Sequence, residues 1–509
     1  MQQPNVNTLG ELKRSGYKNR TVKQEIRENL IQSIQQKQQI FKGILGYEDT
    51  VIPDVERALL SRHNILFLGL RGQAKTRMAR EIVNLMDMWV PVVEGSEIND
   101  NPFAPISLYA RELINEKGDD TPIRWMHRSE RYGEKLATPD VSVADLIGDV
   151  DPIKAANLRL SFADERVIHY GIIPRSHRGI FVINELPDLQ ARIQVSLFNI
   201  LQEGDIQIRG FKLRLPLDIL FIFTANPEDY TNRGSIVTPL KDRIESQIIT
   251  HYPRTVELSK AITEQEADVL AEQLQRVVVP DLCSMLVEQI AMEARKSEYV
   301  DQKSGVSARL TISAYENLVS TAERRALKEN NKRTIVRIAD FIGVMPAITG
   351  KIELVYEGEQ EGPTNVAFRL IGQSIRSLFT QYFPDPQSFK RTGNEAQNRK
   401  TKSSPYQPVI DWFGKGQELT LLQDETDAAY IQRLYQVDGL HAAVKRYYPN
   451  ADEAQAALLM EFLLHGLAEY SLISKKGIES GGYSFGDILG SMLNMNFGTL
   501  DEDDEEEDF

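Results

Sequence analysis

The sequence predicts an α/β fold whose parallel β-sheet is covered by helices, followed by a helical region. In the first half of the chain, short continuous apolar runs alternate with helical patterns. These runs lie at 65–68, 106–108, 180–183 and 219–223. Continuous apolar strands separated by helices are typical of a parallel sheet buried on both faces. From about 256 to 356 the periodicity becomes helical throughout.

Length and charge restrict the class of protein. The chain has 509 residues, of which 41% are hydrophobic, so it can form at least two cores, because single domains stop growing near about 250–300 residues. The formal net charge is −14, and the run 501–508 alone contributes eight acids. The rest of the chain is only mildly acidic, which argues against a nucleic-acid partner.

No apolar run approaches the length of about 18 residues that a membrane span needs, and residues 1–18 read as a polar N-terminal segment. The one cysteine, Cys283, excludes an internal disulfide and a cysteine-cluster metal site. We therefore expect a soluble protein of the cytoplasm.

Helical patterns begin before the first apolar run. An amphipathic helix is predicted within 19–41, and a second helix follows in the stretch GILGYEDTVIPDVERALL. The α/β core predicted from these features spans 19–255. The apolar positions of the first helix recur every four residues, at Val22, Ile26, Leu30 and Ile34.

The second half of the chain divides, by composition, into four regions. We expect a helical lid over 256–356 and a connecting region over 357–408 that includes a polar linker from 385. Further helices are expected over 409–474, and a flexible acidic tail over 475–509.

A loop after the first strand has the composition of a phosphate-binding loop. Its backbone N–H groups and the N-terminus of the helix that follows would converge on an anion. Lys75 would reach the outer phosphates and Thr76 would offer its hydroxyl to Mg²⁺. An ordinary strand-to-helix turn remains the alternative for this segment alone. The loop comprises Gly69, Leu70, Arg71, Gly72, Gln73, Ala74, Lys75 and Thr76.

Ala74 stands where the pattern G-x-x-x-x-G-K-[ST] has its second glycine. Alanine is tolerated there if its φ angle is negative, and it is costly if that angle is positive.

A second strand ends in Asn184 and Glu185. A carboxylate at a strand tip beside a phosphate loop can orient the water that attacks the γ-phosphate, so Glu185 is the predicted catalytic residue. Asn184 can accept a hydrogen bond from a metal-bound water but adds no negative charge. A glutamate that merely caps a helix is the alternative.

Three further residues are candidates. Asn226, at the tip of the next strand, could hold the attacking water or sense the γ-phosphate, and an Asn-Pro turn is its alternative. Arg243, just before a fifth strand, could reach a neighbouring subunit's γ-phosphate, or simply pair with a nearby acid. Arg309 begins a helix of the lid and could fold back on the phosphates.

Taken in order, these motifs resemble the AAA+ group that contains the magnesium chelatase motor subunit and the MoxR ATPases, over about residues 20–350. The resemblance implies a parallel five-stranded α/β core with a helical lid, binding ATP and Mg²⁺. It implies a Walker A motif from Gly69 to Thr76 with Arg77 after it, and an opening stretch around Gly46 and Tyr47 beside the adenine. Glu185 matches the Walker B glutamate, and the preceding position, here Asn184, normally carries aspartate. Asn226 matches the first sensor, Arg243 matches the arginine finger, and Arg309 matches the second sensor.

Two insertions match the same group. Residues 149–175 resemble its helix-2 insertion, and 203–218 its hairpin before the first sensor. The alternation of apolar residues around a turn at Gly210 supports this hairpin independently. The alternating residues are Ile206, Ile208, Leu213 and Leu215.

The resemblance implies an ATP-hydrolysing ring, hexameric, that remodels or assembles a partner protein with a von Willebrand A type domain. It does not imply that this chain chelates a metal. Two alternatives stay open: a scaffold that binds ATP with little hydrolysis, and a DNA-acting motor. The second depends only on a basic cluster formed by Lys390, Arg391, Arg399, Lys400 and Lys402.

Overall fold

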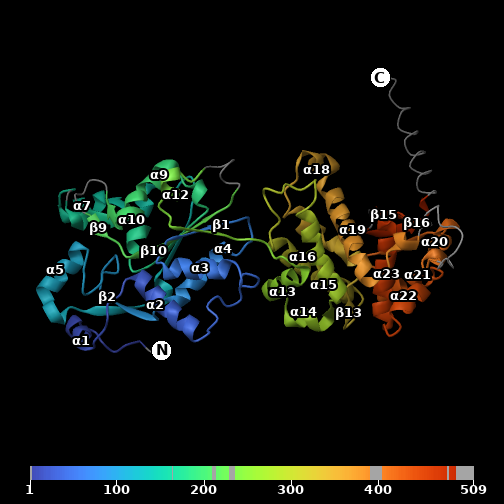
Figure 1. Cartoon of the computed structure of the whole chain (residues 1–509), viewed down its shortest axis with the longest axis horizontal. Coiled ribbons are helices and arrows are strands. Elements are labelled where there is room, and N and C mark those ends of the chain that lie inside the picture. The colour runs from blue at the N-terminus through green and yellow to red at the C-terminus, as the bar shows by residue number, and fades with distance from the viewer. Residues whose placement is uncertain are drawn as a thin grey trace, which may run out of the picture. The chain divides into compact units, whose positions relative to one another are not determined.

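A computed structural model describes residues 3–162, 164–208, 214–227, 235–389, 404–478 and 481–488. The chain forms two compact units, residues 1–252 and 253–509 (Figure 1). The predicted basic cluster at 390–402, the turn at Gly210 with Leu213, and the acidic end at 501–508 lie outside the described residues.

The first unit is built on a parallel five-stranded sheet in the order β11-β1-β10-β7-β4. This confirms the predicted sheet and the strand after Arg243. The strands in chain order are β1 (Ile65–Leu68), β4 (Tyr132–Leu136), β7 (Gly179–Asn184), β10 (Ile219–Ala225) and β11 (Ser246–Ile249).

One strand assignment was wrong. Residues 106–108 are not a strand, because Ser107 caps helix α5 (Leu108–Lys117) by accepting a hydrogen bond from the Ala110 amide. The remaining strand is β4, at the edge of the sheet. Its side chains are only half-buried, so the sequence has no apolar run there to reveal it.

Helices cover both faces of the sheet, as alternate residues of β7 show. Ile180 and Val182 pack with α2 (Val22–Gln35), α3 (Val51–Leu60), α4 (Lys75–Glu81) and η1 (Ile82–Leu85). Phe181 and Ile183 pack on the other face, with α9 (Ala191–Ser196), α10 (Phe198–Glu203) and α12 (Thr238–Lys241). This division follows from the two-residue period of a strand.

The N-terminal residues are part of the fold and not a separate polar segment. Helix α1 (Leu9–Arg14) begins with a capping box made by Thr8 and Glu11. Its Leu12 packs on Ile123 and Trp125 of β3 (Ile123–His127), which pairs antiparallel with β2 (Trp89–Val93). Val6, Leu9, Leu12 and Tyr17 are scattered among polar residues, so the sequence did not predict this packing. Short 3-10 turns complete this part, η2 (Gly118–Asp120) and η3 (Arg128–Glu130).

The two predicted insertions both contain antiparallel pairs. Between β4 and β7, β5 (Gly148–Val150) pairs with β6 (Ile168–Tyr170), and before β10, β8 (Asp205–Gln207) pairs with β9 (Arg214–Pro216). Ile206 lies opposite Leu215, as the alternation predicted. The other elements here are α6 (Val143–Leu146), α7 (Pro152–Leu158), η4 (Glu165–Val167), α8 (Ile172–Arg175) and η5 (Leu186–Asp188).

The second unit is mostly helical and has one continuous hydrophobic core that runs from Val277 to Phe485. The predicted lid, connecting region and C-terminal region therefore share a core. Its helices are α13 (Val256–Glu266), α14 (Ala271–Arg276), α15 (Asp281–Ala294), α16 (Arg309–Lys328), η6 (Ala339–Val344), α17 (Met345–Thr349), α18 (Tyr356–Glu361), α19 (Pro363–Tyr382), η7 (Pro386–Phe389), α20 (Gln407–Gly414), α21 (Asp427–Tyr435), α22 (Leu440–Tyr447) and α23 (Glu453–Glu469).

The lid is not wholly helical, and the tail does not begin at 475. Two short strands, β12 (Val277–Val278) and β13 (Thr334–Ile335), pair in the region expected to be all-helical. A three-stranded sheet contains β14 (Leu419–Leu422), β15 (Ser474–Ile478) and β16 (Gly482–Gly486). Tyr483 and Phe485 of β16 are buried, and their glycine-rich surroundings hid this strand from the sequence prediction. Within the described ranges, no helix is long and apolar enough to cross a membrane.

Candidate functional site

The predicted phosphate loop and two predicted strand tips meet at the carboxyl edge of the sheet. The loop joins β1 to α4, and β10 and β7 are the next two strands. Lys75 Nζ donates hydrogen bonds to Asn226 Oδ1 at 2.7 Å and to Leu70 O at 2.9 Å, and also to Gly69 O. Residues separated by about 150 positions therefore contact one another where ligands bind in open α/β sheets.

Gly69 is required by the path of the loop. Its amide donates to Ala225 O at 3.2 Å, which holds the start of the loop against β10. A Cβ atom at Gly69 would lie 2.0 Å from Thr250 Oγ1 and 2.2 Å from Gln73 Oε1, two atoms that are hydrogen-bonded to each other at 2.7 Å. A side chain there would have to displace Thr250 and Gln73 and break their hydrogen bond, so this arrangement of the loop favours glycine at its first position.

Ala74 adopts the left-handed conformation, with φ 54° and ψ 17°. The sequence left its φ angle open, and the structure gives the costly alternative. For a residue with a Cβ this conformation costs roughly 1 kcal/mol. Gly72, two residues earlier, also has a positive φ, which glycine adopts freely.

The opening stretch packs beneath the loop. The Tyr47 hydroxyl lies 3.0 Å from Gln73 O and 2.8 Å from His251 O, within hydrogen-bonding distance of both. Burial raises the pKa of Tyr47 to about 12. Gly46 beside it has φ 82°. The stretch thus supports the loop backbone, and contact with an adenine ring stays a prediction for Gly46 and Tyr47.

Asn184 occupies the centre of a polar network at the tip of β7. Its Oδ1 accepts hydrogen bonds from the Thr76 hydroxyl at 3.2 Å and from the Thr224 hydroxyl at 3.1 Å. Its Nδ2 donates to Glu134 Oε1 on the neighbouring strand β4, at 2.6 Å. The two residues predicted to serve a metal, Thr76 and Asn184, are therefore in direct contact.

Glu185 follows Asn184 in the left-handed conformation, with φ 55°. Its amide donates to Thr224 Oγ1 at 3.1 Å, which ties the tip of β7 to β10. A non-glycine residue at positive φ is strained, and such strain clusters at functional sites. The half-buried Glu185 side chain belongs to the same strand end as Asn184.

Arg243 has hydrogen-bond partners of its own, separate from this network. Arg243 donates to Gln202 Oε1 at 2.8 and 3.0 Å and to Pro239 O at 2.7 Å, and its guanidinium lies 4.9 Å from the centre of the Phe198 ring. Arg309 is the first residue of α16 in the second unit, as predicted. Their roles in nucleotide binding stay predictions, as does that of Arg77 on α4.

Glu134, Tyr132 and Arg80 were missed by the sequence analysis. Glu134 pairs with Arg80 through two hydrogen bonds of 3.1 and 3.2 Å, and the Tyr132 hydroxyl donates to it at 2.7 Å. Both Tyr132 and Glu134 belong to β4, the strand without an apolar run. The alternation of Tyr132, Glu134 and Leu136 is the only sequence signal that could have indicated them.

The donor atoms present fit a magnesium ion. Mg²⁺ prefers oxygen ligands and retains several waters, so it needs few protein side chains. The Thr76 hydroxyl and the Asn184 amide oxygen supply such atoms, with the Glu134 carboxylate adjacent. In the described part of the chain, no group of three or more His, Cys, Asp or Glu side chains could hold a metal instead.

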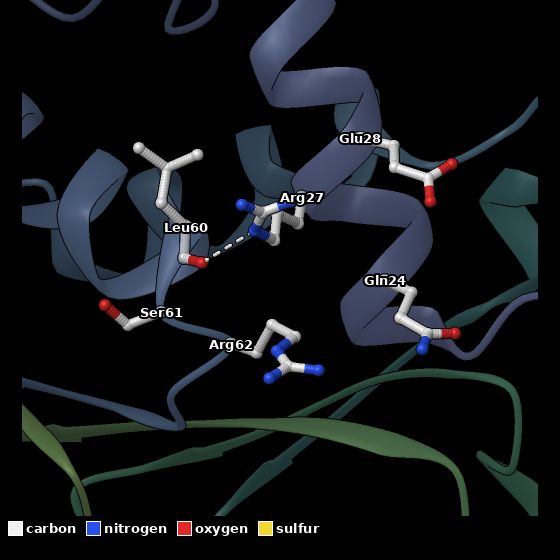
Figure 2. A pocket seen from close by; sticks show the side chains of 6 residues that line it. All are labelled: Gln24, Arg27, Glu28, Leu60, Ser61 and Arg62. Atoms are coloured by element: carbon white, nitrogen blue, oxygen red, sulfur yellow. Dashed lines mark hydrogen bonds between the residues drawn. The ribbon is translucent and has the colours of Figure 1, made fainter.

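A surface pocket of about 460 Å³ lies elsewhere, between α2 and the end of α3 (Figure 2). Arg27 Nε donates to Leu60 O at 3.0 Å across it, and Arg62 points into the same space. Arg62 precedes β1, whereas the phosphate loop follows β1, so this pocket is at the opposite end of that strand. Its lining residues are Gln24, Arg27, Glu28, Leu60, Ser61 and Arg62.

The comparisons with known proteins point to the group that the motifs predicted. The chain is 24% identical, over 207 residues, to the magnesium-chelatase 38 kDa subunit of Cereibacter sphaeroides. The match spans 40% of this chain and 56% of that protein, so this chain covers only about half of its relative. No protein-family profile matches the chain.

The chain has an AAA+ fold and is similar in sequence to a magnesium chelatase subunit. The strand order with a phosphate loop after β1, together with this sequence match, is the basis of that assignment.

Two solved structures are similar to the chain, at lower sequence identity. One is the complex between subunits BchI and BchD of magnesium chelatase, at 18% identity, covering 63% of this chain and 98% of that one, with a TM-score of 0.32. The other is NtrX from Brucella abortus in complex with ATP, at 15% identity, covering 57% and 52%, also with a TM-score of 0.32. Scores this low add nothing to what the sheet of this AAA+ chain shows by itself.

Proposed function

We propose that this AAA+ chain is a cytoplasmic ATPase that binds Mg²⁺–ATP at the loop from Gly69 to Thr76 and hydrolyses it. The observation that carries the proposal is the 2.7 Å hydrogen bond between Lys75 and Asn226, together with the contact between Thr76 and Asn184. These bonds join the loop and two strand tips into one site, as phosphoryl transfer requires.

Each residue then has a distinct task in the proposed reaction. Lys75 and the loop amides would bind the phosphates, and Thr76 and Asn184 would hold Mg²⁺, which when bound would neutralise charge on the phosphate oxygens. Glu185 orients the attacking water and accepts its proton, and Asn226 positions that water or senses the γ-phosphate.

We further propose that the active form is a homo-oligomeric ring, a hexamer, in which Arg243 of one subunit completes the site of the next. Arg243 is held near the surface by Gln202 and Phe198, and an arginine so placed can turn toward a neighbour's phosphate. Arg309 would act as the second sensor. The ring would remodel a partner with a von Willebrand A type domain, using the insertions at 149–175 and 203–218.

A scaffold that binds ATP but hardly hydrolyses it is the second candidate. Two observations favour it: Ala74 is strained at φ 54°, and Asn184 lacks the negative charge of an aspartate. Either feature could slow turnover without preventing nucleotide binding.

Steady-state phosphate release separates the two candidates. The wild-type chain is compared with Glu185→Gln, and binding of a fluorescent ATP analogue is measured for both. We expect Glu185→Gln to bind the analogue normally and to release phosphate about 100-fold more slowly. Glu116→Gln, an exposed change on α5, is the matched control and should behave as wild type. Equal and negligible release by all three proteins, with binding intact, would establish the scaffold and end the motor proposal.

A further inference from the structure

The Glu134 carboxylate lies beside Asn184, at the tip of β7, where the position before Glu185 has no carboxylate of its own. The Asn184 amide has two different surroundings: its nitrogen donates to Glu134 Oε1 at 2.6 Å, and its oxygen accepts from the hydroxyls of Thr76 and Thr224. The contact with Glu134 therefore determines which end of the amide faces Thr76.

The strand register brings these two side chains together. In the β4–β7 pair, Leu136 lies opposite Asn184 and Glu134 lies opposite Val182. Residues two apart on a strand point to the same face, so Glu134 and Asn184 share one face of the sheet.

Helix α4 contacts both residues on that face. Thr76 and Arg80 are four positions apart and so lie on the same side of the helix. Thr76 bonds to Asn184, and Arg80 bonds to Glu134 at 3.1 and 3.2 Å. Glu134 is thus connected to the predicted metal ligands through a single hydrogen bond to Asn184.

The Glu134 carboxylate is fixed and only partly exposed. Its donors are the Asn184 amide, the Arg80 guanidinium and the Tyr132 hydroxyl at 2.7 Å. The side chain is 23% exposed, whereas that of Arg80 is 63% exposed. A charge in such a half-buried position is less screened by solvent than one on the surface, so it acts on its neighbours more strongly.

We propose that Glu134 is a positioning residue that supplies, from the neighbouring strand, the negative charge that Asn184 lacks. It holds the Asn184 oxygen toward Thr76 and adds a carboxylate beside the Mg²⁺–nucleotide site. This inference rests on the proposed function, because the charge matters only if Mg²⁺–ATP binds there.

A purely structural role is the competing explanation. Glu134 would then only fasten α4 to the sheet through Arg80. The variant Arg80→Met separates the two roles, since it removes that ion pair but leaves the carboxylate against Asn184. The charge-swapped variant Asn184→Asp/Glu134→Gln provides the complementary test, because it moves the carboxylate from β4 to the tip of β7.

The experiment titrates MgCl₂ into the full chain with the fluorescent nucleotide mant-ATP, and records the Mg²⁺ concentration at half-maximal binding. We expect Glu134→Gln to raise this concentration about tenfold. Arg80→Met should stay within about twofold of wild type. Asn184→Asp alone places two carboxylates side by side and should lower the melting temperature of the nucleotide-free chain by roughly 3 °C. The double variant Asn184→Asp/Glu134→Gln should have the wild-type melting temperature and the wild-type Mg²⁺ concentration at half-maximal binding.

Two results would overturn the inference while leaving the proposed function intact. One is nucleotide binding by Glu134→Gln with the wild-type Mg²⁺ requirement. The other is an equal rise in that requirement for Arg80→Met, which would show that the ion pair is what matters. Failure of the wild-type chain to bind mant-ATP at any Mg²⁺ concentration would instead refute the proposed function, and this inference with it.

Discussion

The two units of this AAA+ chain use buried polar groups in opposite ways. In the first unit, Lys75, Thr76 and Glu185 are half-buried at one edge of a sheet. In the second unit, Arg325, Asp340 and Glu461 are almost fully enclosed in the helical core. Both sets form networks of hydrogen bonds, but only the first set lies where a ligand can reach it.

All three guanidinium nitrogens of Arg325 donate hydrogen bonds within the enclosed network. Arg325 pairs with Asp340 at 2.9 Å and with Asp427 at 2.6 Å, and it also donates to Thr334 and to Ile335 O. Through these contacts it joins α16 to η6 and α21. A buried arginine of this kind is stable only while its partners remain in place.

The comparison shows that buried charge alone does not locate a functional site. Arg325 is the more deeply buried cation, yet every contact named above satisfies it within the protein. Lys75 lies at the carboxyl ends of parallel strands, where ligands approach open α/β sheets. The four predictions that follow test whether the first set serves a ligand and the second set serves stability.

The largest effect is expected from Arg325→Met. Removing the cation leaves Asp340 buried without its ion pair, and breaking one partner of a buried pair costs about 3–5 kcal/mol. Chemical denaturation followed by circular dichroism should show this loss. Arg324→Met is the matched control: Arg324 is 56% exposed and pairs with Asp424, so its loss should cost less than about 1 kcal/mol. Similar destabilisation by both variants would contradict an enclosed network.

A pH dependence is expected from Glu461. This carboxylate accepts hydrogen bonds from the Ile338 and Ala339 amides and from the Tyr430 hydroxyl, and burial raises its pKa from 4.5 to about 7. The folded protein therefore binds the proton more tightly than the unfolded chain. The resulting stability is fully present below pH 4.5 and is lost as the pH rises through 7, by about 3 kcal/mol.

The measurement compares the free energy of unfolding of wild type and Glu461→Gln between pH 4.5 and pH 8. The wild-type value should fall relative to that of the variant across this range, and other titrating groups cancel in the difference. Parallel curves for the two proteins would show that Glu461 keeps its ordinary pKa.

Lys75→Ala tests the other side of the comparison. Losing the cation should weaken binding of ATP about 100-fold, because Lys75 would contact the outer phosphates. The free energy of unfolding without nucleotide should change far less than for Arg325→Met. Calorimetric titration with ATP gives the affinity, and the exposed Lys42→Ala serves as the control of equal charge change. Unchanged affinity would show that Lys75 and the network around it do not bind the nucleotide.

The sequence predicted the parts of this fold that continuous apolar runs encode. It predicted β1, β7 and β10 because their side chains face two cores, and it placed Glu185 and Asn226 at strand ends. These are properties of neighbouring residues, so local pattern is enough to reveal them.

It could not predict features that depend on packing between distant segments. Strand β4 is half-buried at the sheet edge, and β16 is buried through only two aromatic residues. Since Glu134 lies on β4, its contact with Asn184 followed only from the observed register. The conformation of Ala74 likewise depends on how the loop is held by Thr250 and Gln73.

The smallest effect is expected from Ala74→Gly, which relieves strain within the site itself. Glycine adopts φ 54° freely, so this change should stabilise the chain by roughly 0.5–1 kcal/mol despite the greater freedom of glycine in the unfolded state. Ala156→Gly is the matched control. Ala156 lies on the exposed side of helix α7, where glycine is less favourable than alanine, so this change should destabilise the chain by about the same amount. Thermal melting should therefore show a higher melting temperature for Ala74→Gly and a lower one for Ala156→Gly. If Ala74→Gly also tightens ATP binding, the strain at Ala74 opposes the nucleotide-bound loop; if affinity is unchanged, that strain is present equally in the free and bound states.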